Sequence, residues 1–202
     1  MRSDVVKRAF DVALAMAGLA VLAPLLAVLA LLVKLDSRGP VLFRQERVGR
    51  FGKRFRIHKF RTMCVATASS GQLITVDRDP RITRFGHLLR RYKLDELPQL
   101  IDVLAGDMSF VGPRPEVPRY VEHYPATMRA IILSVRPGIT DLASIAFIDE
   151  ATLLASSKNA EAVYVEQILP KKLEYYKRYV ETRTFGLDLK IILRTLCSVV
   201  RR

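Results

Sequence analysis

Cysteine is scarce in this chain of 202 residues, and its two copies, Cys64 and Cys197, lie far apart. Two cysteines provide neither a disulfide framework nor the ligand spacing of a zinc site. His58 and His87 also lack a second ligand at metal-binding spacing, so packing or surface roles are favoured for both. The sequence therefore gives no sign of a disulfide-stapled domain, and a reducing, cytoplasm-facing environment fits it.

Charged residues are absent from the segment Val12–Val33, which is long enough for a membrane helix. A buried core helix is disfavoured because the segment is apolar on every face and lies near the N-terminus. A cleavable signal peptide is disfavoured because the run is too long and because Lys34, Asp36 and Arg38 follow it directly. A membrane segment is the favoured interpretation.

Two features of this segment favour a helix that enters and leaves the membrane on one side. Pro24 falls near the middle, where proline removes a backbone hydrogen bond and kinks or breaks a helix. Positive charge marks the cytoplasmic side, and basic residues flank both ends: Arg2, Lys7 and Arg8 before, and ten Lys/Arg from Lys34 to Arg61. Each half, at about 1.5 Å per residue, is too short to cross a core of about 30 Å. We therefore expect a re-entrant helix-break-helix over residues 1–36, with a Pro-kinked spanning helix as the alternative.

Acidic residues are outnumbered, since 33 Lys and Arg face 20 Asp and Glu and give a net charge of +13. Such a balance indicates a polyanionic partner, which can be nucleic acid, anionic lipid headgroups or a phosphorylated substrate. A protein that binds nucleic acid would interleave aromatic residues with its basic clusters or carry a known motif. Neither is present, so no nucleic-acid partner is expected. Anionic headgroups and phosphates remain.

The body of the chain predicts a short hairpin followed by helices. Val41–Phe43 and Phe55–Ile57 are strand-like, and Gly49 and Gly52 between them supply the turn. The polar stretch Thr67–Gly71 predicts a loop. Apolar residues then recur at helical spacing from Ile82 to Leu104, interrupted by Pro98, so a new helix is expected to start near Asp95. Further on, Phe110–Glu116 and Arg136–Asp141 are expected to form rigid loops.

Two basic amphipathic helices are predicted near the C-terminus, at Pro170–Tyr179 and Leu187–Val200. Such helices can lie on the headgroup layer, or they can pack on the core as ordinary surface helices. No internal repeat and no second folded unit is evident. The expected fold class is α+β and mostly helical, with the membrane segment at residues 1–36 and a cytoplasmic catalytic domain at residues 37–202.

Asp95 and Glu96 are the candidate catalytic pair. An isolated Asp-Glu pair is most often a helix cap with a solvated neighbour, but here cations surround it: Arg90, Arg91 and Lys93 before, and Arg114 in a loop stiffened by two prolines. Phosphate chemistry requires cations for the phosphate oxygens and a carboxylate for a divalent metal. A carboxylate can also attack phosphorus and form an acyl phosphate. The residues alone thus predict a membrane enzyme that acts on phosphates.

Several motifs resemble those of one known family. In order along the chain they are GPVLFRQERVG (39–49), KFRTM (59–63), LDELPQL (94–100), MSFVGPRPE (108–116), RPGIT (136–140) and DLKIIL (188–193). Together they resemble the bacterial sugar transferase family, specifically its small monotopic polyprenol-phosphate phosphoglycosyl transferases. The resemblance runs over nearly the whole chain.

The resemblance implies a covalent mechanism. In the family the aspartate that matches Asp95 is the nucleophile, which forms a phospho-sugar intermediate with loss of UMP and contacts Mg²⁺. The glutamate that matches Glu96 is thought to assist the metal or the incoming polyprenol phosphate. Arg114 matches a phosphate-binding arginine, and Lys59 and Arg90 match further basic positions of the active site.

The resemblance also implies the substrates and the place of action. UDP-sugar and undecaprenyl phosphate would give undecaprenyl-diphosphate sugar and UMP, the first membrane step of surface-glycan biosynthesis. The enzyme would act at the cytoplasmic face of the bacterial inner membrane, inserted in one leaflet. The family's re-entrant helix breaks at a proline that matches Pro24. Whether two copies pair as a homodimer is left open.

Two departures from the family pattern limit what carries over. Ala23 stands where many relatives place a serine before the proline, so the expected break depends on Pro24 alone. After Thr140 the chain reads Asp141-Leu142-Ala143-Ser144, and this stretch together with Asp149-Glu150 differs from many members. The sugar is therefore open; a UDP-linked N-acetylated amino- or deoxyamino-hexose is preferred over UDP-glucose or UDP-galactose. A phosphatase acting on the lipid carrier and a membrane-tethered scaffold are the alternative functions.

Overall fold

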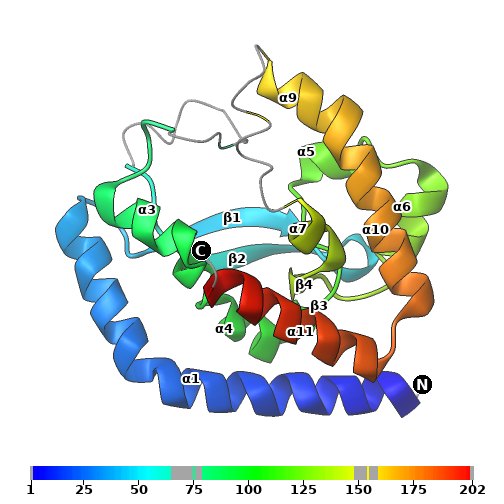
Figure 1. The fold of residues 1–202 in the computed structure, drawn as a ribbon, viewed down its shortest axis with the longest axis horizontal. Helices are drawn as coiled ribbons and strands as arrows, with labels where there is room; N and C mark the ends of the chain where they lie inside the picture. The colour runs from blue at the N-terminus through cyan, green and yellow to red at the C-terminus, as the bar shows by residue number, and fades with distance from the viewer. Residues whose placement is uncertain (1, 65–74, 76–78, 148–153, 155–158, 201–202) are drawn as a thin grey trace.

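The computed structural model describes residues 2–64, 75, 79–147, 154 and 159–200 (Figure 1). This part is mostly helical and contains two small two-stranded sheets, which agrees with the predicted α+β class. The loop predicted at Thr67–Gly71 and the divergent pair Asp149-Glu150 lie outside the described residues.

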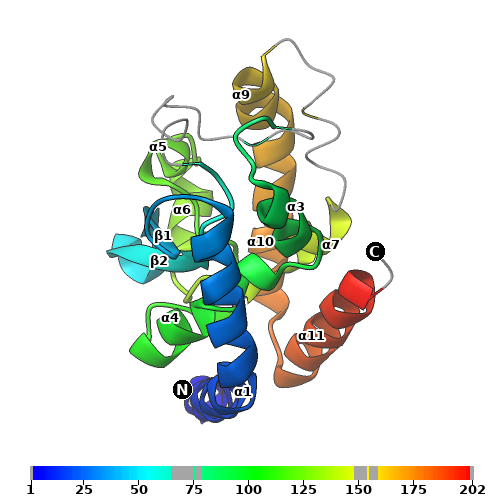
Figure 2. The ribbon, with the colours of Figure 1, turned by 90° about the vertical axis from the view of Figure 1, so that its left-hand side faces the viewer.

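The apolar N-terminal segment forms the helix α1 (Arg2–Asp36), which continues through Pro24. Two arms of α1 meet in a bend (Figures 1 and 2). A proline inside a helix donates no backbone hydrogen bond and crowds the preceding turn, so Pro24 supplies the physical cause of a bend. The expected break is thus a bend in one continuous helix. Within the described chain, α1 alone is long and apolar enough to cross a membrane.

Both arms of α1 pack against the rest of the protein. Before Pro24, Ala15 is fully buried in a cluster with Phe55, Ile57, Leu100, Val103 and Met108. After Pro24, Leu29 and Val33 are buried with Phe60 and Leu89. The opposite surface of α1 is exposed and apolar, as Val21 and Leu31 are 77% and 59% exposed. One surface of α1 is therefore covered by the protein body, while apolar side chains on the opposite surface are left exposed.

The predicted hairpin is present and longer than expected. Strand β1 (Leu42–Val48) pairs antiparallel with β2 (Arg54–Phe60), with Leu42 opposite Phe60 and Val48 opposite Arg54. The turn is the short 3₁₀ segment η1 (Arg50–Gly52), in which Phe51 and Gly52 have positive φ angles of 57° and 78°. Charged residues occupy much of β1, which is why its apolar pattern predicted only its first residues.

Two helices separated by a tight turn follow the hairpin. The first helix is α3 (Arg84–Arg91) and the second is α4 (Gln99–Ala105). The turn between them is the 3₁₀ segment η2 (Leu94–Glu96). Thr83 caps α3 by accepting a hydrogen bond from the amide of Gly86. Lys93 has a left-handed φ of 53°, which ends α3 and turns the chain into η2. The predicted interruption near Pro98 is confirmed, since Pro98 immediately precedes α4.

A second, parallel sheet joins the two segments predicted as rigid loops. It consists of β3 (Ser109–Val111) and β4 (Gly138–Thr140), and three short helices lie between and after them: α5 (Pro118–Val121), α6 (Ala126–Ile132) and α7 (Leu142–Ala146). Gly112 and Gly138 allow the close approach of these segments, because a Cβ on Gly138 would lie 2.1 Å from the amide nitrogen of Gly112. This sheet was not predicted.

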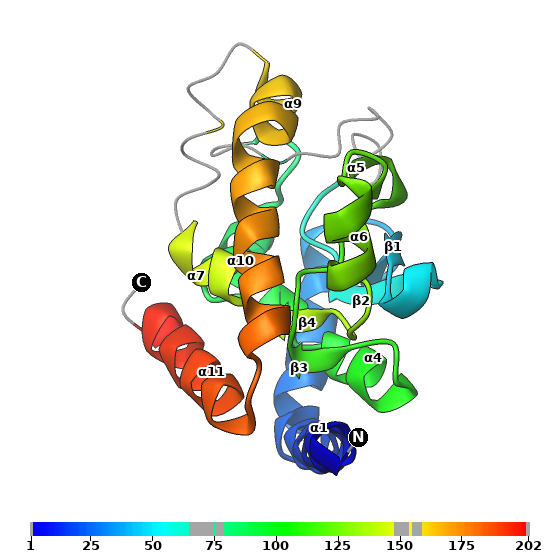
Figure 3. The same ribbon diagram turned by 90° about the vertical axis from the view of Figure 1, so that its right-hand side faces the viewer.

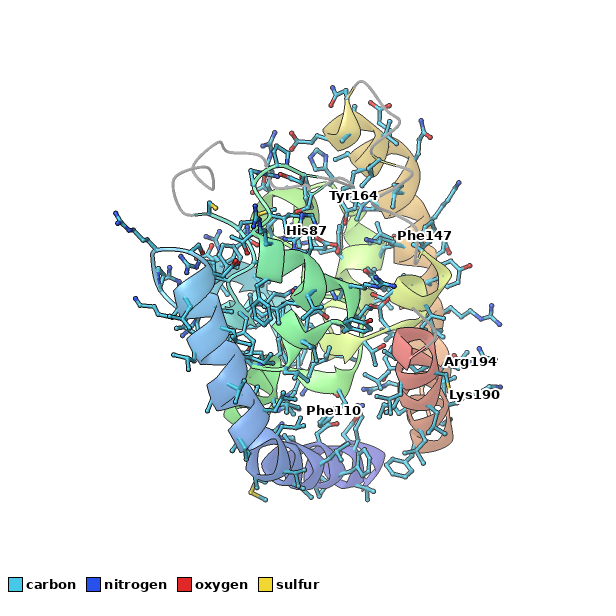
Figure 4. All side chains as sticks on the ribbon, turned by 60° about the vertical axis from the view of Figure 1, so that its left-hand side comes forward. His87, Phe110, Phe147, Tyr164, Lys190 and Arg194 are labelled. Atoms are coloured by element: carbon cyan, nitrogen blue, oxygen red, sulfur yellow. The ribbon has the colours of Figure 1, made fainter. Side chains whose placement is uncertain are left out.

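The C-terminal helices occur where the sequence predicts them. The short α9 (Ala160–Val163) continues through a π-helical turn, η3 (Tyr164–Ile168), into α10 (Leu169–Thr182), and α11 (Phe185–Val200) follows. α10 packs against α6 and α7, and α11 runs obliquely away from the lower end of α10 (Figure 3). The start of α11 lies beside the first arm of α1, since the ring centres of Phe10 and Phe185 are 5.0 Å apart. Figure 4 shows Lys190 and Arg194 projecting from α11 away from the protein body. Leu193 and Leu196 on α11 are also exposed.

Candidate functional site

Asp95 and Glu96 occupy the turn between α3 and α4, where both side chains are buried. They are 9% and 8% exposed. The left-handed residue Lys93 reverses the chain just before them, and the amide of Glu96 donates to the carbonyl of Lys93. The pair lies beside the end of β2, the strand that carries Lys59. The local fold therefore presents two carboxylates inside the protein, and both require compensating charge.

Glu96 is held by two cations. Lys59 Nζ donates to Oε1 of Glu96 at 2.6 Å, and a guanidinium nitrogen of Arg114 donates to the same oxygen. Burial alone would raise the pKa of Glu96, but Arg114 and Lys59 lower it well below its ordinary value. Burial in turn lowers the pKa of Lys59, which Glu96 partly offsets. Glu96 is thus an ionised carboxylate with both of its neighbouring cations fixed in place.

Asp95, in contrast to Glu96, has no bonding partner in the described part of the chain. Its carboxylate accepts no hydrogen bond and forms no ion pair within the described residues. Burial raises the pKa of Asp95 above its ordinary value, while Lys59 acts in the opposite direction. A carboxylate that is surrounded by cations but bound to none of them keeps its oxygens available for a ligand. Of the two adjacent acids, Asp95 is the one free to react or to bind a metal.

Arg90 is placed by the segment that follows β2. Its Nε donates to Oγ1 of Thr62 at 2.8 Å, and the carbonyl of Thr62 accepts from the amide of Thr83. Gly86 allows α3 to approach Thr62 this closely, because a Cβ at that position would lie 2.3 Å from the carbonyl oxygen of Thr62. Burial lowers the pKa of Arg90, whereas the charge of Asp95 raises it. Arg90 therefore faces the site without a direct bond to either carboxylate.

Three polar residues, Arg47, Glu116 and Tyr164, fix the loop that carries Arg114. Arg47 donates to the carbonyl of Pro115 at 3.0 Å, and Tyr164 donates to Oε1 of Glu116 at 2.6 Å. Arg47 also lies 3.8 Å from Oε2 of Glu116. These three residues hold the peptide on either side of Arg114. No sequence pattern marked Arg47, Glu116 or Tyr164 as functional residues, although Glu116 lies in the MSFVGPRPE motif.

Other residues of the basic motif serve the scaffold. Arg61 is buried and donates to backbone carbonyls at the end of α1, those of Val33, Ser37 and Arg38, which caps that helix. His58 bonds through Nδ1 to Asp102 on α4 at 2.6 Å. The packing role favoured for His58 is consistent with this contact. Lys59 alone of this trio points its charge at Glu96.

The described carboxylates could hold a magnesium ion only with help from ligands outside the protein. No cluster of three or more His, Cys, Asp or Glu side chains suited to a metal occurs in the described residues. Magnesium commonly binds one or two carboxylates and completes its shell with phosphate oxygens and water. Within that part of the chain Asp95 has both oxygens unengaged, whereas Oε1 of Glu96 is bound by Lys59 and Arg114 and only Oε2 is left. Of the two carboxylates, Asp95 would therefore offer more oxygens to such an ion.

Chemically, the arrangement suits a phosphate ester. Lys59, Arg90 and Arg114 come from three different segments and converge on two carboxylates, and a phosphate bound among these cations would have its charge neutralised. In a buried setting such preorganised cations stabilise phosphoryl transfer more strongly than they would in water. A free carboxylate at the same place can attack phosphorus. The structure thus brings together all five residues that the sequence proposed for the site.

Comparison with known proteins places these features in a family. The sequence model described as bacterial sugar transferase matches residues 2–202. A UDP-N-acetylgalactosamine-undecaprenyl-phosphate N-acetylgalactosaminephosphotransferase of Aeromonas hydrophila is 34% identical and covers 96% of this chain. A UDP-glucose:undecaprenyl-phosphate glucose-1-phosphate transferase of Escherichia coli (strain K12) is 38% identical and covers 94%. This chain spans only 44% and 39% of those two proteins.

A third relative has nearly the length of this chain. The exopolysaccharide production protein PSS of Rhizobium leguminosarum bv. phaseoli is 38% identical over 98% of this chain and 96% of its own length. The matches to the two longer relatives cover 96% and 94% of this chain, so they extend over the segment from Lys59 to Arg114.

Proposed function

Because the chain belongs to the bacterial sugar transferase family, we propose that it transfers a sugar 1-phosphate from a UDP-sugar to undecaprenyl phosphate. The observation that carries this proposal is the asymmetry of the two buried carboxylates. Glu96 is bound by Lys59 and Arg114, whereas Asp95 has no bonding partner among the described residues. One acid organises the cations and the other is available as the nucleophile.

In the first step, a carboxylate oxygen of Asp95 attacks the phosphorus that bears the sugar. A new Asp95 oxygen–phosphorus bond forms, the bond to the bridging diphosphate oxygen breaks, and UMP leaves with the electron pair. In the second step, a phosphate oxygen of undecaprenyl phosphate attacks the same phosphorus. The acyl phosphate bond breaks and the Asp95 carboxylate returns, so a difficult transfer is divided into two displacements.

Lys59, Arg90 and Arg114 bind the phosphate oxygens in both steps. Their fixed positions matter because catalysis of phosphoryl transfer consists mainly of positioning and charge stabilisation. Lys59 and Arg114 are already oriented by Glu96, and Arg90 is oriented by Thr62. Glu96 would then guide the incoming lipid phosphate. A magnesium ion at Asp95 would neutralise the diphosphate charge and improve the leaving group.

The packing of α1 supports the membrane placement that we propose. Both arms of this helix pack on the body that carries the site, and its outer surface is apolar. A straight span would carry one arm away from the body, whereas a bent helix inserted in one leaflet keeps both contacts. We therefore favour the re-entrant arrangement, with the active site at the cytoplasmic face of the bacterial inner membrane, where a lipid phosphate and a soluble nucleotide sugar can meet.

The sugar is the open element of the proposal. The Aeromonas relative is named for N-acetylgalactosamine and the Escherichia relative for glucose, so similarity to them supports more than one donor. Our preference is a UDP-linked N-acetylated amino- or deoxyamino-hexose. The product would be the first lipid-linked sugar of a surface glycan.

The deciding experiment measures UMP release by the purified protein from a panel of UDP-sugars, with Mg²⁺ and with or without undecaprenyl phosphate. Wild type and Asp95→Asn are compared. UMP release that requires the lipid and is absent from Asp95→Asn supports the proposal and identifies the sugar. Activity that survives in Asp95→Asn would remove the nucleophile, and release of free sugar phosphate without a lipid product would favour a phosphatase.

A further inference from the structure

A small basic cavity lies outside the proposed active site, since none of the site residues lines it. It has a volume of about 30 Å³ and is bordered by the first arm of α1, the hairpin turn and β3. Five of its lining side chains are cationic: Lys7, Arg8, Arg50, Arg136 and Arg183. Two are acidic, Asp4 and Asp11. The cavity thus has an excess of positive charge, and the question is which of the cations are available to a ligand.

Three of the five cations are engaged by the protein. Lys7 pairs with Asp188 at 2.6 Å, and Arg183 pairs with Asp4 at 3.1 Å. Arg8 donates to the carbonyls of Val103 and Leu104, which caps the C-terminal end of α4. These contacts fasten the first arm of α1 to the body. They also remove Lys7, Arg8 and Arg183 from consideration as the main ligand-binding groups.

Arg50 and Arg136 are arranged differently. Each donates from Nε to a backbone carbonyl, Arg50 to Ser134 at 2.9 Å and Arg136 to Gly106 at 2.8 Å. Their terminal guanidinium nitrogens have no hydrogen-bond partner among the described residues. Arg50 is further held by stacking over Phe51, with its guanidinium carbon 4.5 Å from the ring centre. Two planar donors are therefore fixed at one edge and leave the other edge for an acceptor.

The most suitable acceptor for such a pair is a phosphate or another tetrahedral oxyanion. Guanidinium groups bind these anions through paired hydrogen bonds, and fixing the group beforehand reduces the entropy lost on binding. None of Lys59, Arg90 and Arg114 lines this cavity. Arg50 lies at the turn of the hairpin and Lys59 near its open end, about 20 Å apart at roughly 3.3 Å per strand residue.

The position of α1 indicates where that phosphate comes from. The arm of α1 that lines the cavity through Lys7 and Arg8 exposes Val5 and Val6, which are 70% and 58% exposed. A ligand here meets fixed cations beside a helix with an apolar outer surface. We propose that Arg50 and Arg136 bind the headgroup phosphate of an anionic phospholipid, whose acyl chains lie along the outer surface of α1. This contact sets the depth of the first arm in the leaflet.

The test uses the full chain in nanodiscs that contain phosphatidylcholine with phosphatidylglycerol, followed by mild detergent extraction and native mass spectrometry. Wild type is compared with the double variant Arg50→Gln/Arg136→Gln. Arg54→Gln is the matched control, because Arg54 lies on the same hairpin but is exposed and paired with Glu46. We expect the double variant to retain phosphatidylglycerol at least about tenfold less than wild type and the control.

A footprint on the wild-type protein makes the test independent of the folding of the variant. Phosphatidylglycerol should protect Arg50 and Arg136, but not Arg54, from an arginine-directed dicarbonyl reagent. Equal lipid retention by all three proteins, or no protection, would overturn the proposal. Inorganic phosphate is the second arm: if it protects both arginines as well as the lipid does, the site binds a free phosphate and the lipid assignment is wrong.

Discussion

Lys59 Nζ lies 2.6 Å from Oε1 of Glu96, so the lysine is bound to the second carboxylate of the pair and not to the first. Arg114 donates to the same oxygen. One oxygen of Glu96 holds both cations, and neither of them is bonded to Asp95, the preceding residue. Two acids that are adjacent in sequence therefore have different environments, and different environments are how proteins assign separate tasks to like groups.

The first prediction separates these tasks. Asp95→Asn should abolish exchange of labelled UMP into UDP-sugar in the absence of lipid, because this exchange requires the covalent intermediate. Glu96→Gln should lower this exchange to some extent, because Glu96 orients Lys59 and Arg114, but it should lower transfer to undecaprenyl phosphate much more, on the order of 100-fold. Exchange and overall transfer are measured on the same preparations. Glu46→Gln, which removes an exposed carboxylate paired with Arg54, is the control and should resemble wild type.

An equal loss of both half-reactions in Glu96→Gln would contradict the separate roles. Thermal melting in detergent accompanies the kinetics, because removing the charge of Glu96 leaves Lys59 and Arg114 buried without their partner. Breaking a buried pair in this way costs about 3–5 kcal/mol. Activity is therefore compared at a temperature where each variant remains folded.

The second prediction concerns the close approach that places Arg90. A Cβ at Gly86 would lie 2.3 Å from the carbonyl oxygen of Thr62, and Thr62 is the hydrogen-bond acceptor for Arg90. Gly86→Ala should lower the free energy of unfolding by about 1–3 kcal/mol through overpacking and should also reduce activity. Gly186→Ala is the matched control, since nothing lies within 4 Å of its Cβ position. It should leave stability unchanged or raise it by up to about 1 kcal/mol, because alanine is favoured over glycine in a helix and Gly186 lies in α11.

Chemical denaturation in detergent micelles measures both glycine variants. If Gly86→Ala matched Gly186→Ala in stability and activity, the contact between α3 and Thr62 would not be needed to position Arg90. A loss of stability without a loss of activity would limit Gly86 to a packing role.

The elements with a regular apolar pattern could be predicted from the sequence. The helices of the C-terminal region were expected at Pro170–Tyr179 and Leu187–Val200 and occur at Leu169–Thr182 and Phe185–Val200. Their apolar residues recur every three or four positions over several turns, which is a strong signal. The helical region interrupted before Pro98 was also predicted correctly, because proline has few compatible positions in a helix.

The parallel pair of β3 and β4 could not be predicted in the same way. Each strand has three residues, which is too short for alternation to be recognised, and the partners lie far apart in the chain. The candidate site was found as a set of residues through motif resemblance. Its internal arrangement was not, because the bond from Arg114 to Glu96 and the bond from Tyr164 to Glu116 depend on tertiary packing.

The third prediction tests the support beneath Arg114. Tyr164 donates to the buried carboxylate of Glu116, and Glu116 lies two residues after Arg114. Tyr164→Phe leaves an acceptor of Glu116 without its donor and should destabilise the protein by about 1–3 kcal/mol. It should also lower kcat more than it raises KM, because Arg114 would be less well positioned when charge develops on the phosphate.

The matched control is Tyr175→Phe, which removes a hydroxyl from a partly exposed ring on the same run of helix. It should leave kcat and the free energy of unfolding near the values of wild type. If Tyr164→Phe lost stability while keeping the kcat of wild type at permissive temperature, the hydroxyl would stabilise the fold without positioning Arg114.

The fourth prediction concerns stability at alkaline pH. Burial raises the pKa of Tyr120 from 10.0 to about 12, with Glu161 and Glu116 acting in the same direction. Burial also raises the pKa of Tyr124 and Tyr176. In the unfolded chain a tyrosine loses its proton near pH 10, so above that pH the unfolded state binds fewer protons than the native state. The contribution of these tyrosines to the free energy of unfolding is fully present below about pH 10, and it falls as the pH rises toward their native pKa values.

Denaturant titrations at a series of pH values, with phenolate absorbance recorded in parallel, measure this effect. The buried tyrosines should ionise only together with unfolding, while the exposed ones ionise earlier. Tyr120→Phe removes one of the contributing protons, so the decline of its unfolding free energy between pH 10 and pH 12 should be shallower than that of wild type. Equal slopes for the two proteins would show that Tyr120 ionises with the same pKa in the native and unfolded states, and its burial would then impose no constraint on the phenol.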